Sequence, residues 1–500
     1  MEAVFQNCKN GEKTVILNGF LYHSAYNPTK EAERFVQNLT PPFLPEIIFI
    51  TEPGLSYCAS FLKAKFPETK IVAVRFSCIF SDYDGYFDEI INFYEFDFNQ
   101  EHIENFLFYK YGEISILLSF FCSWTLSPKV FPQMEQLFWN CIKNITEKAK
   151  TLLITSQFFE TKWFKNSLNF FKYIKNPIKL SKKIDIPVCI IASGPSLQKA
   201  AAILQKNQNN FFIIALSSSI TFCLENNIIP DLCISTDGGY WAGEHLKKLA
   251  INNTKRKIDE NLVLAITPES YCKKSILHSI EILPLIYEDG ISSKLSNQSD
   301  LSFFTAKRNG TVSGTALQFA IQYSSKEIFF FGLDLACNNG YQHANPNELQ
   351  TNSHIFDYKI NSLEKKVSLS QFSSASLKIY ENWFSSFNIF NRNIFRIIDE
   401  NDAKNKLGQI KDISVANFKS ICDNLQTIEQ KESFFEKQNV TVNKENIINE
   451  LKTIFFNDDV KKQFYPLDFI LYKHTNNTEI LNKIEKKHKE LYDKAVKMFE

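Results

Sequence analysis

The chain of 500 residues lacks the features that mark several common classes of protein. Its 56 Lys and Arg residues balance 55 Asp and Glu residues, so no net charge attracts it to nucleic acid or to a membrane surface. No stretch of about 18 apolar residues is free of charge, and the N-terminal residues are charged where a secretory signal needs apolar ones. We therefore expect no membrane span, no nucleic-acid partner and no secretion.

Paired cysteines and glycine-rich loops are also lacking. The 11 cysteines form no C-x-x-C pair and many stand in apolar runs, which predicts reduced thiols in the core and a cytoplasmic location. Only 15 glycines are present, and the turn at Gly194, Pro195 and Ser196 matches neither the G-x-G-x-x-G of dinucleotide folds nor the G-x-x-x-x-G-K-[ST] of phosphate loops. A nucleotide would have to be recognised in another way.

Apolar strand patterns alternate with helical patterns over most of the chain. This alternation predicts α/β domains with parallel sheets: a smaller N-terminal domain over residues 1–150 and a central, doubly wound Rossmann-like domain over residues 151–400. After residue 400, amphipathic helices rich in Lys and Glu replace the strand patterns. We therefore expect an α-helical C-terminal domain over residues 401–500.

Ligands of doubly wound sheets bind beyond the carboxyl ends of the strands, so the loops that follow the strands are the candidate sites. Gly194, Pro195 and Ser196 stand before a predicted helix, whose free N–H groups and dipole suit a single phosphate. Ser217 begins a run of three serines after the next strand, and Asp237 precedes two glycines after the third. Each of these loops is equally compatible with a plain turn or a helix cap.

A fourth region carries the groups that a nucleotide-linked substrate needs: donors for a phosphate, a carboxylate for a ribose diol and a titratable imidazole. These residues are Thr311, Ser313, Gly314, Asp334, Tyr341 and His343, with His354 a little further along the chain. A single histidine in a sequence is often structural, so both a structural and a catalytic role stay open for His343 and His354.

Taken together, these motifs resemble the motility-associated factor (Maf) flagellin glycosyltransferases. The resemblance rests on GPSL, IIPDLCISTDG, TVSGTALQFAIQYSSKEIFFFGLDLA, GYQHA and, at residues 23–36, HSAYNPTKEAERFV, and it extends over roughly residues 10–400. The central domain of that family is similar to bacterial sialyltransferases that use CMP-activated nonulosonic acids. It is more remotely similar to archaeal 6-hydroxymethylpterin diphosphokinases.

The resemblance implies transfer of a sialic-acid-like sugar, such as pseudaminic or legionaminic acid, from a CMP donor to Ser or Thr of flagellin in the cytoplasm. It implies inversion at the anomeric carbon, a role in flagellar assembly and motility, and no obligatory metal or cofactor. By position, the turn from Gly194 through Pro195 to Ser196 matches the loop that contacts CMP. Ser313 and Gly314 match the helix start of the sialyltransferases, and Asp334 matches the strand end near the ribose.

The resemblance offers two histidines for the general base and one tyrosine for the phosphate. The segment Asn352-Ser353-His354 is similar to the one that bears the sialyltransferase general base, while His343, within GYQHA, competes for that role. Ala336 replaces a tyrosine of the sialyltransferases, so Tyr341 is the tyrosine expected to bind the departing phosphate.

Two other functions are compatible with the same residues. A diphosphokinase that moves pyrophosphate from ATP to a pterin-like alcohol would use Asp237 and Asp334 to hold Mg²⁺. A non-catalytic escort that binds flagellin would use the first and last domains instead.

Overall fold

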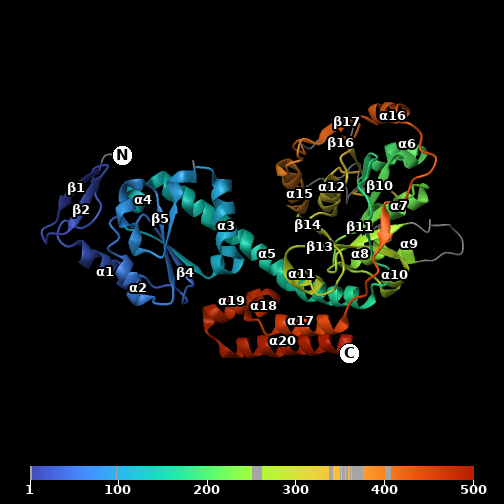
Figure 1. Cartoon of the computed structure of the whole chain (residues 1–500). Coiled ribbons are helices and arrows are strands. Elements are labelled where there is room, and N and C mark those ends of the chain that lie inside the picture. Colours follow the sequence, from blue (N-terminus) through green and yellow to red (C-terminus); the bar gives the residue numbers. More distant parts are fainter. Residues whose placement is uncertain are drawn as a thin grey trace. The chain divides into compact units, whose positions relative to one another are not determined.

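The computed structural model describes residues 3–96, 98–250, 262–336, 342–349, 351, 355, 358–360, 362, 375–399 and 407–500. The chain folds into two compact units (Figure 1). The first comprises residues 1–160 and 457–491, and the second comprises residues 161–456 and 492–500. None of the helices within the described ranges combines the length and the apolarity that crossing a membrane requires.

The first unit contains two sheets. The antiparallel sheet has the order β1-β2-β3 and the parallel sheet has the order β6-β5-β4-β7. The strands are β1 (Ala3–Asn7), β2 (Lys13–Leu17), β3 (Phe20–Leu21), β4 (Ile47–Thr51), β5 (Lys70–Arg75), β6 (Glu89–Asn92) and β7 (Ser119–Ser123). The helices of this part are α1 (Pro28–Asn38), α2 (Ala59–Lys65), α3 (Gln100–Leu117), α4 (Ser127–Val130) and the first part of α5 (Pro132–Tyr173), which continues into the second unit, with 3-10 helices η1 (Cys78–Tyr86) and η2 (Phe93–Phe96). The predicted α/β character of the N-terminal region is confirmed.

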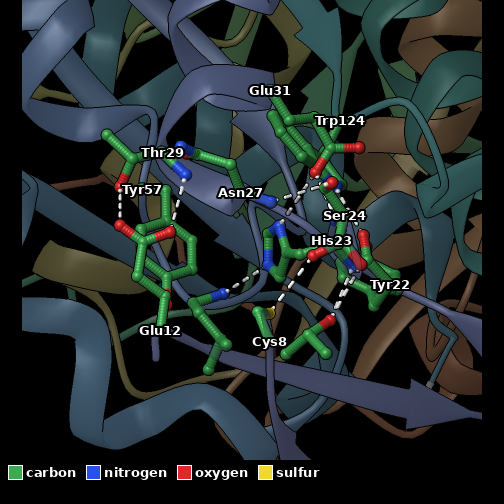
Figure 2. A network of polar contacts seen from close by, with 12 residues as sticks. Cys8, Glu12, Tyr22, His23, Ser24, Asn27, Thr29, Glu31, Tyr57 and Trp124 are labelled. Carbon is green, nitrogen blue, oxygen red and sulfur yellow. Dashed lines mark hydrogen bonds and ion pairs between the residues drawn. The ribbon is translucent and has the colours of Figure 1, made fainter. Parts of the chain in front are cut away.

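The motif that opens at residue 23 takes part in a network of polar contacts in the first unit (Figure 2). His23 Nε2 accepts the Leu55 N–H at 2.9 Å, which holds the loop after β4. Asn27 caps α1 by accepting the Lys30 N–H at 2.7 Å, and Glu31 accepts the Ser24 N–H at 2.7 Å. In this structure the motif therefore connects and orients elements of the first unit.

The second unit is built on one nine-stranded sheet with the order β14-β13-β12-β11-β10-β9-β15-β16-β17, in which every neighbouring pair is parallel. Its strands are β9 (Val188–Ile191), β10 (Phe212–Leu216), β11 (Leu232–Ser235), β12 (Val263–Ile266), β13 (Glu281–Tyr287), β14 (Phe304–Ala306), β15 (Ile328–Phe331), β16 (Ile394–Ile397) and β17 (Lys411–Ile413). Strands such as β9 and β10 are apolar at every position because helices cover both faces of a parallel sheet.

The helices of the second unit flank this sheet, with α6 and α7 on one side and α12 and α15 on the other (Figure 1). They are α6 (Leu197–Asn207), α7 (Ile220–Glu225), α8 (Tyr240–His245), α9 (Lys247–Ala250), α10 (Lys274–Ser279), α11 (Gly290–Ser296), α12 (Val312–Tyr323), α15 (Ala375–Ser386), α16 (Val415–Asp423) and α17 (Lys444–Phe455), with 3-10 helices η3 (Gln208–Asn210) and η4 (Ser217–Ser219). A two-stranded pair joins β8 (Ile178–Leu180) to β18 (Phe435–Lys437). The predicted doubly wound central domain is confirmed.

The division of the chain differs from the expected boundaries at residues 150 and 400. α5 runs without a break from Pro132 to Tyr173, so residue 150 lies inside a helix. β17 pairs with β16 in the central sheet, and β18 pairs with β8, so much of the region after residue 400 belongs to the second unit. These strands are three residues long, too short for a periodic signal. The last helices are α18 (Asp458–Phe464), α19 (Pro466–Thr475) and α20 (Thr478–Phe499).

Candidate functional site

The strand order of the central sheet reverses beside β9. From β9 the chain adds β10 to β14 in one direction, and then returns to place β15, β16 and β17 on the opposite side. The carboxyl ends of β9 and β15 are therefore neighbours at the point where the strand order reverses, which is where doubly wound sheets bind ligands. The loops that follow these two strands and β10 form the candidate site.

The turn of Gly194, Pro195 and Ser196 is held by the loop after β15. Ser196 donates its N–H to Asp334 Oδ2 at 2.8 Å and its hydroxyl to Asp334 Oδ1 at 2.5 Å. A Cβ on Gly194 would lie 2.5 Å from the Gly332 carbonyl oxygen, so glycine is required for the close approach of these two backbones. The Asp334 carboxylate thus occupies the Ser196 N–H that we expected a phosphate to bind, and it complements the positive end of α6.

The start of α12 has no comparable occupant. Thr311 at the N-cap makes no capping hydrogen bond, and its hydroxyl lies 2.8 Å from the Ser313 hydroxyl. Among the described residues, no acceptor meets the N–H groups of residues 312–314. A Cβ on Gly314 would lie 2.6 Å from Asn309 Oδ1 and 2.9 Å from the Trp383 ring, so Gly314 allows close packing here. Asn309 Oδ1 accepts the Thr311 N–H at 2.9 Å, and the next N–H groups of α12 are the ones that an anion could bind.

His343 closes a chain of hydroxyl groups across three loops. The Ser218 hydroxyl donates to Ser193 Oγ at 3.0 Å, and Ser193 Oγ lies 3.0 Å from His343 Nδ1. The Ala344 N–H donates to the Ser193 carbonyl at 2.7 Å, which ties this segment to the end of β9. Burial, and secondly the charge of His245, lower the pKa of His343 to about 4. His343 is therefore neutral at neutral pH.

A second imidazole, which sequence reasoning missed, lies in the same cluster. His245 Nδ1, at the end of α8, is 3.2 Å from Glu348 Oε2, and the Thr221 hydroxyl binds Glu348 Oε1. Burial raises the pKa of Glu348, but the hydrogen bonds from His245 and Thr221 outweigh it and hold that pKa below its ordinary value. His245 and Glu348 are 103 positions apart, and no local spacing signals their pairing.

The other predicted site residues have separate places. Asp237 is exposed, and its Oδ1 accepts the Gly239 N–H at 2.8 Å ahead of α8. Ser217 is buried at the start of η4. Tyr341 and His354 lie outside the described residues. Within the parts of the chain that the structure describes, no group of three or more His, Cys, Asp or Glu side chains is placed to hold a metal ion.

Comparison with known proteins finds similarity over the central region of the chain. A family model described as 6-hydroxymethylpterin diphosphokinase MptE-like matches residues 160–340. Two proteins of Treponema pallidum (strain Nichols), each described as uncharacterized, are 25% identical over 266 residues and 21% identical over 182 residues. The matches cover 53% and 35% of this chain, and they span only 56% and 30% of the lengths of these relatives.

A solved structure extends the likeness to the full length. The MAf glycosyltransferase from Magnetospirillum magneticum AMB-1 matches 100% of this chain and 90% of its own, with a TM-score of 0.58 and 12% sequence identity. At this identity the shared property is the fold. The central region therefore matches the MptE-like model, the chain has the fold of a Maf glycosyltransferase, and the resemblance inferred from the motifs is confirmed at the level of the fold.

Proposed function

We propose that the protein is a glycosyltransferase that moves a nonulosonic acid from a CMP donor to Ser or Thr of flagellin, supporting flagellar assembly. The fold that it shares with a Maf glycosyltransferase supports the transferase part of this proposal. The observation that carries the donor is the start of α12, where the N–H groups of residues 312–314 have no acceptor among the described residues, beside Thr311 and Ser313 at the carboxyl edge of the sheet. A donor with a single phosphate needs one such helix end.

The chemistry of this edge suits departure of CMP. Cleavage of the bond to the phosphate develops negative charge on a phosphate oxygen, and preformed N–H and hydroxyl donors stabilise that charge. We assign the phosphate to the N–H groups of residues 312–314 and the Ser313 hydroxyl. Asp334 holds the Gly194 to Ser196 turn as one wall of the donor site, because both Ser196 donors are already bound to that carboxylate.

Binding of CMP to the full-length protein is the first test. We expect CMP without metal to raise the melting temperature, since binding to the folded state alone stabilises it by mass action. Indifference to CMP would contradict the proposed donor. The intact mass of flagellin from cells with and without the protein tests the acceptor, and an unchanged mass would overturn the transfer to flagellin. Capture of flagellin at unchanged mass would instead identify an escort.

A diphosphokinase is the second candidate, because the family model that matches residues 160–340 is described by that activity. It requires ATP and Mg²⁺, with Asp237 and Asp334 as metal ligands. Asp334 is engaged with Ser196, and Asp237 with the N–H of Gly239, in the structure. The same thermal experiment separates the two functions: stabilisation by ATP with Mg²⁺ and not by CMP would favour the diphosphokinase.

A further inference from the structure

We propose that His245, oriented by Glu348, is the base that takes the proton of the acceptor hydroxyl, and that His343 acts as a neutral hydrogen-bond donor. This division of roles rests on the proposed glycosyl transfer and deepens it. It also differs from the expectation that His343 or His354 is the base. In both histidines Nδ1 is the engaged nitrogen, but its partner is a carboxylate in His245 and a hydroxyl in His343.

His245 has its Nδ1 engaged with a carboxylate. Glu348 holds a pKa below its ordinary value, so it is ionised at neutral pH and can only accept hydrogen bonds. The proton of a neutral His245 therefore lies on Nδ1, 3.2 Å from Glu348 Oε2, and Nε2 carries a free lone pair. Thr221 binds the other oxygen of Glu348, which fixes the orientation of the carboxylate. A carboxylate in this position also stabilises the imidazolium that proton abstraction creates.

His343 has the opposite arrangement. The Ser218 hydroxyl donates to Ser193 Oγ, and this oxygen lies 3.0 Å from His343 Nδ1. In the proposed arrangement the Ser193 hydroxyl donates to His343 Nδ1, which places the proton of His343 on Nε2 as a donor. With a pKa of about 4, caused first by burial, His343 is too weak a base to be matched to neutral pH. Its neutral N–H can still bind developing negative charge.

The acceptor hydroxyl oxygen forms a bond to the anomeric carbon of the sugar, and the bond from that carbon to the phosphate oxygen breaks. The electron pair of the broken bond stays on the phosphate oxygen, and CMP leaves. The acceptor proton passes to His245 Nε2 and then to water, while His343 Nε2–H donates a hydrogen bond to the departing CMP.

The kinetic test uses the full-length protein, recombinant flagellin, and CMP-pseudaminic, CMP-legionaminic and CMP-N-acetylneuraminic acids as donors. His245→Ala is expected to lower turnover by about a hundred- to ten-thousand-fold while CMP affinity is kept, and added imidazole is expected to restore part of it. His278→Ala, which alters an exposed histidine at the end of α10, is the matched control and should retain full turnover.

The outcomes separate the two proposals. If the unaltered protein transfers sugar and His245→Ala transfers it equally well, the role of His245 is overturned while the proposed function stands. If the unaltered protein transfers none of the sugars, the proposed function fails, and the base assignment fails with it.

Nitrogen-15 NMR of the histidine-labelled protein tests the same inference without turnover. We expect His245 to carry its proton on Nδ1 and His343 to carry it on Nε2, with each signal assigned from the spectrum of its alanine variant. Glu348→Gln should remove the preference of His245 for the Nδ1–H form and leave the His343 signal unchanged. A purely structural role for Glu348 does not require this change in the His245 signal. Observation of His245 as the Nε2–H form would overturn the proposal.

Discussion

Lowering the pH should destabilise the first unit through His23. Burial, and secondly the charge of Arg75, lower the pKa of His23 from its ordinary 6.5 to about 3. Its Nε2 accepts the Leu55 N–H and its ring packs against Trp124 at 5.2 Å between centroids, so an added proton removes an acceptor inside a closed site. The pKa of His23 is lower in the folded state than in the unfolded state. Its contribution to the free energy of unfolding is therefore complete above pH 6.5 and is lost as the pH falls toward 3.

The size of this effect follows from the linkage between protons and folding. Between pH 6.5 and pH 5, His23 lowers the free energy of unfolding by about 1.4 kcal/mol for each pH unit. Over about 1.5 pH units this amounts to about 2 kcal/mol. Glu52 acts in the opposite direction: burial raises its pKa to about 6 although Arg75 opposes this, so acidification between pH 6 and 4.5 favours the folded state. The contribution of His23 must therefore be measured as a difference between two proteins that share Glu52.

The assay compares the full-length protein with His23→Gln by urea unfolding at pH 7 and at pH 5, followed by tryptophan fluorescence, to which Trp124 contributes from beside the site. Between pH 7 and pH 5, the free energy of unfolding of the variant is expected to fall by about 2 kcal/mol less than that of the unaltered protein. His102→Gln, an exposed histidine of α3, is the control and should follow the unaltered protein. Equal losses for His23→Gln and the unaltered protein would refute the reasoning that His23 is kept neutral by burial.

Three further predictions concern the central sheet. Gly194→Ala puts a Cβ 2.5 Å from the Gly332 oxygen and should cost about 1–3 kcal/mol in urea unfolding, whereas unchanged stability would contradict that packing. Asp334→Asn replaces a carboxylate that accepts both Ser196 donors and should cost about 1–3 kcal/mol in thermal unfolding; an equal melting temperature would show that the pair is dispensable. Ser313→Ala should weaken CMP binding by about 0.5–1.5 kcal/mol in calorimetry at equal melting temperature, and unaltered affinity would remove this hydroxyl from the donor site.

Several properties of the protein could be read from local patterns in the sequence. Continuous apolar strands alternating with helical segments predicted the two parallel sheets, because burial on both faces requires apolar residues at every position of a strand. The same patterns located the loops after β9, β10 and β15, since every parallel strand ends at the same edge of its sheet. The start of α12 at Thr311 was predicted from its small and hydroxyl residues.

The tertiary structure decided which of these groups meet. Asp334 reaches Ser196 across 138 positions because β15 returns to pair with β9, and this pairing converts an expected phosphate site into a turn filled by its own carboxylate. His245 and Glu348 come together across 103 positions. Local periodicity sets where a strand begins and ends, whereas the order of strands in a sheet depends on the packing of the whole domain. The loops that form the candidate site were therefore predictable from the sequence, and the contacts between their residues were not.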